Sequence, residues 1–192
     1  MSQGLFRTLA EDLRTVVARD PSVYTRREAL LHPALPALWV HRVAHRLYRG
    51  GWRCTARLAM LLARAFTGTE IHPGAVLGRR VFIDHGAAVV IGETAVIGDD
   101  VTLYHQVTLG AIGFWRDNLR PAGERRHPLV GDGVIIGANA TVIGPVAIGA
   151  GAVIGAQALV VRDVPPGARI LAAGGVQYPA SASPRRVRWR AS

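Results

Sequence analysis

One histidine of this chain has the type and setting for proton transfer. His85 stands between Asp84 and Gly86 in a predicted turn, where a side chain is expected to be exposed. Imidazole is the side chain best matched to moving a proton near neutral pH. A purely structural role, in which His85 only hydrogen-bonds the turn, is the alternative that the residue itself leaves open.

Further residues could complete a site around this histidine. Glu70 precedes it by fifteen residues, and we expect its carboxylate to lie on the neighbouring coil and to orient the imidazole. Arg126 and His127 end a long polar stretch and would supply a cation and a second imidazole for a carboxylate. Ala138 and Ala156, eighteen residues apart and each next to a glycine, predict a groove for an extended ligand that bears amides. Tight coil packing is the alternative explanation for these small residues.

These residues belong to a six-residue repeat that runs from Ile71 to Val164. An aliphatic anchor returns at every sixth position, and a small or β-branched residue follows four positions later. A period of six fits neither a helix nor an ordinary strand and is typical of a parallel β-helix. Three hexads make one coil, so residues eighteen apart should stack. The anchors are Ile71, Leu77, Ile83, Ile91, Ile97, Leu103, Leu109, Val130, Ile136, Val142, Ile148, Ile154 and Val160.

Two interruptions break this repeat. Ile83 and Ile91 are eight residues apart instead of six, and Leu109 and Val130 are twenty-one apart. An insertion that loops outward costs a solenoid little, and such loops often carry function. Both groups of candidate polar residues lie in these interruptions.

The residues before the repeat read as helices. Apolar residues recur at helical spacing up to Asp20-Pro21, Thr25 and Glu28 form a capping box, and two more helices extend to Gly50 and to Phe66. The predicted fold is α+β. It has an α-helical cap domain over residues 1–68, a parallel β-helix over residues 69–176 and a basic tail over residues 177–192. The cap would cover the open first coil.

Two features of the helices resemble reactive sites. His41 and His45 have the spacing of a zinc pair on a helix, but no Glu follows the first of them, so we expect both to serve packing. Cys54 is the single cysteine, and we expect it to be a small buried residue.

Composition excludes several mechanisms and indicates a compartment. The formal net charge of the 192 residues is +10, and all 23 basic residues are Arg. The lack of Lys excludes Schiff-base, P-loop and pyridoxal-lysine chemistry. A single cysteine, with no signal peptide or apolar span in view, predicts a cytoplasmic protein without a membrane partner. The basic charge raises the possibility of nucleic-acid binding, but no recognised binding module accompanies it, so we expect no such partner.

The ordered set of motifs resembles the serine O-acetyltransferases, a family of hexapeptide-repeat acyltransferases. The resemblance covers roughly residues 10–175. It is carried by Arg19-Asp20-Pro21, Trp39 to His45, Thr69 to Ala75, Ile83 to Gly86, Val90 to Ala95, Val107 to Gly110 and Arg126-His127-Pro128. It implies a left-handed β-helix that transfers acetyl from acetyl-CoA to L-serine, giving O-acetylserine for cysteine synthesis, with no metal. It also implies a homotrimer or a dimer of trimers, with sites between subunits.

The resemblance also assigns roles to residues. In the family, the histidine matching His85 is the general base, and the carboxylate matching Glu70 pairs with it. Residues matching Asp20 and Asp84 hold the amino acid, whose carboxylate meets those matching Arg126 and His127. The expected site is therefore His85 and Glu70 for catalysis, Asp20, Asp84, Arg126 and His127 for the substrate, and Ala138 and Ala156 for acetyl-CoA.

Departures from the family leave other readings open. The long loop from Ala111 to Arg125 lies where the acceptor would be chosen, so another hydroxy amino acid or a specialised metabolite is an alternative acceptor. The chain ends in Arg-Ala-Ser instead of the Ile by which many relatives dock O-acetylserine sulfhydrylase, so the resemblance does not extend to that partner. Two other classes remain: a non-catalytic scaffold, and a zinc enzyme of the carbonic anhydrase type. The zinc candidates are His72, His85, His105 and His127.

Overall fold

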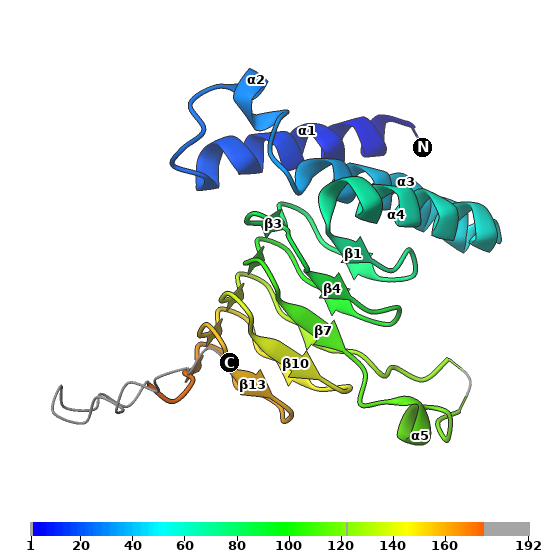
Figure 1. Cartoon of the computed structure of the whole chain (residues 1–192), viewed down its shortest axis with the longest axis vertical. Coiled ribbons are helices and arrows are strands. Elements are labelled where there is room, and N and C mark those ends of the chain that lie inside the picture. The colour runs from blue at the N-terminus through cyan, green and yellow to red at the C-terminus, as the bar shows by residue number, and fades with distance from the viewer. Residues whose placement is uncertain (1, 122, 175–192) are drawn as a thin grey trace, which may run out of the picture.

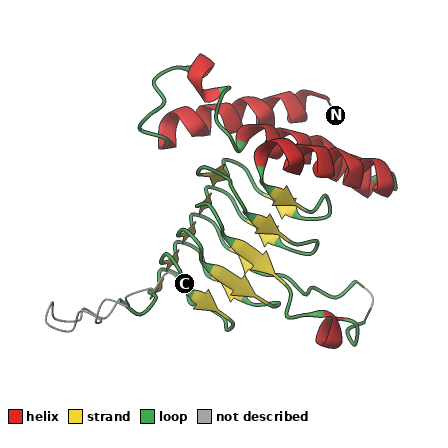
Figure 2. Cartoon of the chain, in the orientation of Figure 1, coloured by secondary structure: helices red, strands yellow, loops and turns green. Residues whose placement is uncertain are grey.

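The computed structural model describes residues 2–121 and 123–174. The four N-terminal helices gather at one end of a stack of short strands, and a fifth short helix lies apart from them in a loop, as Figures 1 and 2 show. The helices are α1 (Ser2–Arg19), α2 (Arg26–Ala29), α3 (Leu35–Arg49), α4 (Arg53–Thr67) and α5 (Phe114–Asp117).

The four N-terminal helices begin and end where the sequence predicts. α1 stops at Arg19, directly before Asp20-Pro21. The capping box of α2 is present, because the Thr25 hydroxyl accepts from the Glu28 amide while the Glu28 carboxylate accepts from the Thr25 amide. Gly68 ends α4 with φ 68°, a left-handed conformation that glycine adopts without strain.

The strands wind into a left-handed parallel β-helix with three faces. The first sheet contains β1 (Glu70–Ile71), β4 (Val90–Ile91), β7 (Thr108–Gly110), β10 (Thr141–Ile143) and β13 (Leu159–Val160). The second contains β2 (Val76–Leu77), β5 (Val96–Ile97), β8 (Leu129–Val130) and β11 (Ala147–Ile148). The third contains β3 (Phe82–Ile83), β6 (Thr102–Leu103), β9 (Ile135–Ile136), β12 (Val153–Ile154) and β14 (Arg169–Ile170).

The hexad anchors fill the interior of the coil. Every anchor named from the sequence is buried, from Ile71 at the first coil to Val160 near the last. Coils without an insertion repeat after eighteen residues, as in the pairing of Val90 with Thr108. The first interruption lengthens the offset to twenty residues, so Glu70 pairs with Val90, and Val89 is the fully buried residue at that corner while Ala87 is exposed.

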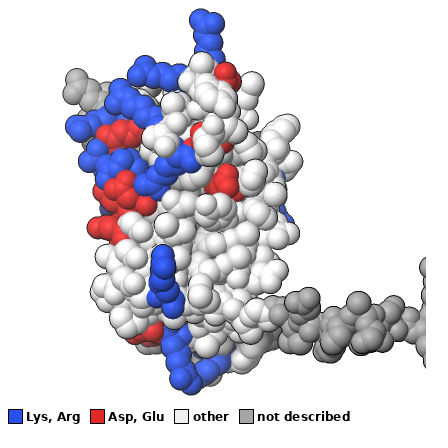
Figure 3. Space-filling model, turned by 90° about the vertical axis from the view of Figure 1, so that its left-hand side faces the viewer, with Lys and Arg blue, Asp and Glu red and all other residues white. Residues whose placement is uncertain are grey.

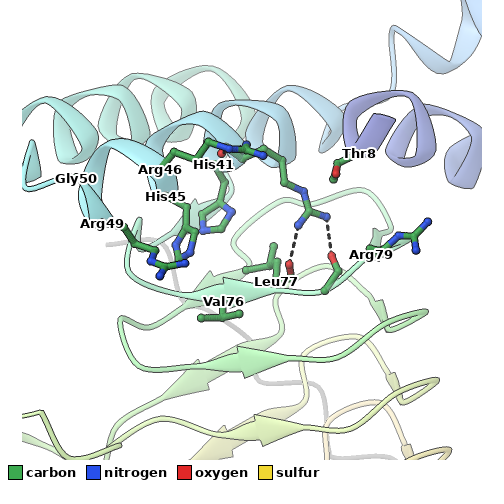
Figure 4. A pocket seen from close by; sticks show the side chains of 11 residues that line it. Thr8, His41, His45, Arg46, Arg49, Gly50, Val76, Leu77 and Arg79 are labelled. Atoms are coloured by element: carbon green, nitrogen blue, oxygen red, sulfur yellow. Dashed lines mark hydrogen bonds between the residues drawn. The ribbon is translucent and has the colours of Figure 1, made fainter. Parts of the chain in front are cut away.

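A buried ion pair fastens the helices to the first coil. The Arg42 guanidinium donates to both carboxylate oxygens of Asp12 on α1, at 3.2 and 3.1 Å. It also donates to the carbonyls of Leu77 and Gly78, at 2.7 and 2.8 Å, across a groove of about 650 Å³ between α3 and β2 (Figure 4). The guanidinium of Arg42 therefore joins α1 and α3 to the first coil of the β-helix.

The two helix histidines line the same groove. His41 is buried, and burial lowers its pKa to about 3, while the ring of His45 contacts the Pro73 carbonyl at 2.9 Å. Their rings stack 5.7 Å apart. This arrangement accords with a packing role.

The expectation that Cys54 is buried was wrong. Its side chain is exposed at the start of α4, because Ala56, Met60 and Ala63 form the face of that helix that enters the core. The opposite face of α4 exposes apolar residues, among them Leu58, Leu61 and Phe66. Among the described helices, none combines the length and apolarity needed to cross a bilayer.

The basic charge is partly balanced on the surface of the helices and first coils. Figure 3 shows arginines intermingled with acidic side chains there, and fewer charges over the later coils on this face. Glu11 pairs with Arg79, and Asp100 pairs with both Arg19 and Arg80. Three of the arginines of the helices and first coils are therefore engaged in local ion pairs.

Candidate functional site

His85 lies at a corner of the β-helix where the third sheet turns into the first. We call this the histidine corner; it comprises residues 84–88, 104–106, 137–139 and 155–157 on successive coils. Ala88, Gln106, Asn139 and Gln157 have φ between 55° and 62°, so each coil turns here through a left-handed residue. His85, with φ 59°, is an additional left-handed residue in the first interruption of the repeat. The candidate base thus lies in the inserted residues, three positions before the regular column of left-handed residues that begins at Ala88.

The backbone around His85 is tightly held. The Thr69 hydroxyl donates to the Gly86 carbonyl at 2.8 Å, and the Ala88 amide donates to the Gly68 carbonyl at 2.9 Å. Gly86 has φ 77°, and a Cβ there would lie 2.8 Å from Ala34 Cβ, so only glycine lets the helical cap approach this closely. The backbone of the histidine corner is therefore held in place and positions the side chain of His85.

The imidazole itself projects into solvent. The His85 side chain is 71% exposed, and its Nε2 lies 3.7 Å from Asp84 Oδ2. The ring of His105 on the next coil meets it edge to face, with centroids 5.7 Å apart. An exposed imidazole beside a carboxylate on a rigid turn can accept a proton from a bound alcohol.

Asp20 reaches the histidine corner from the end of α1. Ser22 donates to Asp20 Oδ1 through its hydroxyl at 2.6 Å and its amide at 2.9 Å. These hydrogen bonds, helped by the nearby His32 and His85, lower the pKa of Asp20 and favour its carboxylate form. The sequence-predicted residues Asp20, Asp84 and His85 are thus brought into one neighbourhood.

His32 also lies at this corner, although the sequence reading did not include it in the site. Its Nε2 is 4.0 Å from Asp20 Oδ2, and its side chain is only 4% exposed. Burial lowers its pKa, while the carboxylates of Asp20 and Asp84 act in the opposite direction. No sequence signal marks this residue, because it is placed here by the packing of the α2–α3 connection.

Ala138 and Ala156 continue the histidine corner on the later coils. The amides of Gln106, Asn139 and Gln157 donate to the carbonyls of Ala87, His105 and Ala138, at 2.8, 3.0 and 2.8 Å. These bonds connect the coils from His85 to Ala156. A Cβ on Gly137 would lie 2.5 Å from the Ala156 amide nitrogen, so glycine is required for this close spacing. The small residues form a narrow column that starts beside the imidazole.

Arg126 and His127 lie at a second corner, where the first sheet turns into the second. We call this the loop corner; it comprises residues 72–74, 92–94, 110–121 and 123–127. The Thr94 hydroxyl accepts from the amides of Arg126 and His127, at 2.9 and 3.1 Å, and the Arg126 guanidinium pairs with Glu93. The end of the long loop is therefore anchored to the previous coil.

The hydrogen bonds of His127 define its tautomer. The Thr94 amide donates to His127 Nδ1 at 3.1 Å, so the proton of the neutral ring is on Nε2. Burial lowers the pKa of His127, and the neighbouring Arg126 charge adds to this effect. A neutral ring with an Nε2–H, next to a guanidinium, is suited to donate to a carboxylate.

The long loop contains structure that the sequence reading did not predict. Its short helix α5 is tied by Asp117, whose carboxylate accepts from the Gly113 amide at 2.7 Å and from Arg120 Nε at 3.2 Å. Phe114 and Trp115 contact each other edge to face and are largely exposed, 74% and 61%. The loop corner therefore includes an exposed apolar surface.

Glu70 does not contact His85 in this structure. Its Oε2 pairs with Arg64 Nη1 at 2.7 Å, and the residue lines a pocket of about 450 Å³ under α4 together with His72. Among the described residues, no hydrogen bond or ion pair joins it to His85. The pairing expected from the sequence stays a prediction.

The two corners lie at opposite ends of the strands of the first sheet. In Figure 1, the chain enters β1, β4 and β7 from the histidine corner and leaves them toward the loop corner, where α5 stands. One chain therefore does not bring Arg126 and His127 to His85. The four zinc candidates are divided in the same way, and no group of three potential ligands suited to a metal occurs within residues 2–121 and 123–174.

Comparison with known proteins agrees with the six-residue repeat. Residues 127–162 match the family "Bacterial transferase hexapeptide (six repeats)". The chain is 51% identical over 165 residues to the serine acetyltransferase of Mycobacterium tuberculosis, covering 85% of this chain and 69% of that protein.

Solved structures give the same result. The Neisseria gonorrhoeae serine acetyltransferase in complex with serine superposes with a TM-score of 0.79 and 36% identity, covering 92% of this chain and 69% of that one. The Brucella abortus serine acetyltransferase in complex with coenzyme A gives 0.80 and 33%, covering 88% and 65%.

The chain is shorter than the proteins it matches. It spans 55% to 65% of several further curated serine acetyltransferases. On the strength of the close relationship to the M. tuberculosis protein, the chain belongs to the serine acetyltransferase family.

Proposed function

We propose that the protein is a serine O-acetyltransferase that moves the acetyl group of acetyl-CoA to the hydroxyl of L-serine. The observation that carries the proposal is the rigidly mounted, exposed His85 beside Asp84 and Asp20, in a chain of this family. The relatives crystallised with serine and with coenzyme A support the two substrates. The product is O-acetylserine, a precursor for cysteine synthesis.

In the proposed reaction, His85 is the general base. Its imidazole takes the proton of the serine hydroxyl as the oxygen attacks the thioester carbonyl, and a tetrahedral intermediate forms. The intermediate collapses, the C–S bond breaks, and the imidazolium returns its proton to the departing thiolate. A positioned base of this kind contributes roughly 10²- to 10⁴-fold to the rate. Glu70 is proposed to orient the ring once its carboxylate turns from Arg64.

The acceptor is proposed to be held by its two charged ends. The serine ammonium binds the carboxylates of Asp20 and Asp84, both of which lie near His85. The serine carboxylate binds the Arg126 guanidinium and the Nε2–H of His127. The first pair lies at the histidine corner and the second at the loop corner, so the two ends are recognised by different copies of the chain.

This division supports a homotrimer, or a dimer of trimers, with each site between two copies. The column that contains Ala138 and Ala156 would bind the pantetheine arm of acetyl-CoA, whose amides can pair with the backbone at this edge. Residues 1–68 would act as a cap domain on the β-helix formed by residues 69–176. The chemistry suits the cytoplasm, where acetyl-CoA and serine are both available. The tail over residues 177–192 lies outside the described residues.

The exposed apolar residues of the long loop favour a second class of acceptor, a larger hydroxylated compound. The side chains of Phe114, Trp115 and Leu119 are exposed at the loop corner and would make apolar contacts with such an acceptor. This surface favours testing other hydroxy amino acids and larger alcohols alongside serine.

The experiment that tests the proposal measures release of free thiol from acetyl-CoA with purified protein. L-Serine is compared with L-threonine, L-homoserine and larger alcohols. We expect turnover with L-serine and a kcat/KM that exceeds that of the other acceptors. Preference for another hydroxyl compound would replace serine by that acceptor, and absence of thiol release with every acceptor would refute the transferase.

A further inference from the structure

We propose that His32 is a positioning residue of the acceptor site, which holds the Asp20 carboxylate where the ammonium group of the amino acid binds. The proposal rests on the proposed function and adds a residue to it. It starts from a buried polar side chain whose position hydrogen bonding within the fold does not explain.

The position of His32 is fixed by the connection between α2 and α3. The His32 amide donates to the Ala29 carbonyl at 3.1 Å, and the Leu35 amide donates to the His32 carbonyl at 3.2 Å. Two residues further on, Ala34 packs directly against Gly86 at the histidine corner. The backbone therefore holds this imidazole against the turn that carries His85.

Only one of the two ring nitrogens of His32 faces a polar group. The ring packs on Phe82, with centroids 5.5 Å apart, and Nδ1 is buried with no hydrogen-bond partner among the described residues. A neutral imidazole carries one N–H, and since no acceptor faces Nδ1, the proton is on Nε2. Nε2 faces Asp20 Oδ2 at 4.0 Å, so a shift of about 1 Å forms a hydrogen bond.

His32 gives the second oxygen of the Asp20 carboxylate a polar neighbour. Ser22 occupies Oδ1 with two hydrogen bonds, and His32 stands at Oδ2. The carboxylate is thereby limited to one orientation before any ligand arrives, which lowers the entropic cost of binding an ammonium. Asp84 and His85 also lie close enough to His32 to act on its charge, so the imidazole is near all three residues proposed to meet the amino group and hydroxyl of the acceptor.

His41 also buries ring nitrogens without a partner among the described residues, so an unpaired nitrogen alone does not mark a functional histidine. His32 differs in directing Nε2 at the carboxylate of Asp20. Phenylalanine would fill the same space against Phe82 without an orphaned nitrogen. The structure therefore distinguishes two functions of the side chain, namely the volume of the ring and the N–H directed at Asp20. Two substitutions separate them.

The test compares His32→Phe, which keeps the volume, with His32→Gln, whose amide nitrogen can take the place of Nε2. We expect His32→Phe to raise the KM for L-serine roughly tenfold, the usual effect of losing a hydrogen bond to a charged group. The KM for acetyl-CoA should stay unchanged and kcat should change less than about threefold. His32→Gln should restore most of the serine affinity. His41→Gln, at a buried histidine outside the site, is the matched control and should leave both KM values unchanged.

A ligand without the ammonium gives an independent readout. The inhibition constant of 3-hydroxypropionate, which is serine without its amino group, should be the same for wild type and His32→Phe. Calorimetric titration of L-serine should show the loss of affinity directly, and thermal unfolding should show that both variants are folded.

Each outcome decides the proposal. An unchanged serine KM in a folded His32→Phe variant would overturn it, as would equal losses for L-serine and 3-hydroxypropionate, or a His32→Gln variant as impaired as His32→Phe. If the wild type neither binds nor acetylates L-serine, the proposed function fails and this inference fails with it. If the wild type acetylates L-serine and His32→Phe matches it, only the role of His32 is refuted.

Discussion

The imidazole of His127 lies directly over the α-carbon of Gly92, so that a Cβ on Gly92 would be 2.0 Å from His127 Cδ2. No shift of a few tenths of an ångström accommodates that contact. Because Gly92 has no side chain, the ring of His127 on the next coil can approach the backbone of Thr94. The two residues form a unit that fixes one donor of the proposed carboxylate site.

Gly92→Ala should weaken acceptor binding by displacing this ring. We expect the KM for L-serine to rise about tenfold or more, because the Nε2–H of His127 moves away from the carboxylate, while the KM for acetyl-CoA changes little. Steady-state kinetics with each substrate varied in turn measures the effect. Gly50→Ala is the control, since a Cβ there meets its neighbours at 3.4 Å or more. An unaltered serine KM for Gly92→Ala would contradict the assigned role of His127.

Removal of the proposed base should affect the chemical step. His85→Asn keeps a residue type that tolerates φ 59° and removes the base, so the turn should persist. We expect kcat to fall by roughly 10²- to 10⁴-fold. The melting temperature should stay close to that of the wild type, because the side chain is exposed. Near-normal turnover by this variant would show that another group takes the proton.

Most of the architecture follows from local rules that the sequence displays. The hexad period predicts the coil because every inward position must be aliphatic, and Thr25, Glu28 and Gly68 mark helix ends through hydrogen bonds and backbone geometry confined to a few residues. The eighteen-residue stacking of Ala138 and Ala156 follows from the same period. Such features depend on near neighbours, so one chain without a structure is enough to predict them.

The parts of the site that the sequence did not predict depend on distant packing or on side-chain rotation. His32 reaches Asp20 and Asp84 only because Ala34 packs on Gly86, a contact between segments about fifty residues apart. The carboxylate of Glu70 was expected beside His85, but in this structure it pairs with Arg64, so the expected pairing stays a prediction. Nor does any period describe an insertion, so α5 could not be foreseen.

One ion pair should make stability depend on pH in the acid range. The hydrogen bond from Arg79 lowers the pKa of Glu11 from 4.5 to about 2, against a smaller opposing effect of burial. A carboxyl whose pKa is depressed by folding contributes stability above its ordinary pKa and loses it as the pH falls through the folded value. Wild type should therefore lose more stability than Glu11→Gln between about pH 4.5 and 2. Parallel curves of melting temperature against pH would contradict this.

The buried pair between Asp12 and Arg42 should be a main attachment of the cap. Asp12→Ala leaves a buried guanidinium without its counter-charge and should cost about 3–5 kcal/mol of unfolding free energy. Arg7→Ala, at an arginine whose side chain is 76% exposed, should cost less than about 1 kcal/mol. Chemical denaturation followed by circular dichroism measures both. Equal effects of the two substitutions would show that the buried pair contributes no more than a surface contact.

The separation of the two corners leads to a test of where a complete site forms. His85→Asn removes the proposed base from the histidine corner of one copy. The double variant Arg126→Ala/His127→Ala removes the proposed carboxylate-binding side chains from the loop corner of another. Each variant alone should be nearly inactive. If each site uses one corner from each of two copies, unfolding and refolding the variants together should place an intact histidine corner opposite an intact loop corner in some interfaces.

Random assembly of equal amounts gives such an interface in about one case in four, so the mixture should regain about a quarter of the wild-type activity. The same variants refolded separately and then combined serve as the control, because closed oligomers exchange subunits slowly. Activity that stays at the level of the separate variants after joint refolding would mean that one chain supplies both corners of its own site. That result would require a large rearrangement of the loop at residues 111–125, since the first sheet now stands between the two corners.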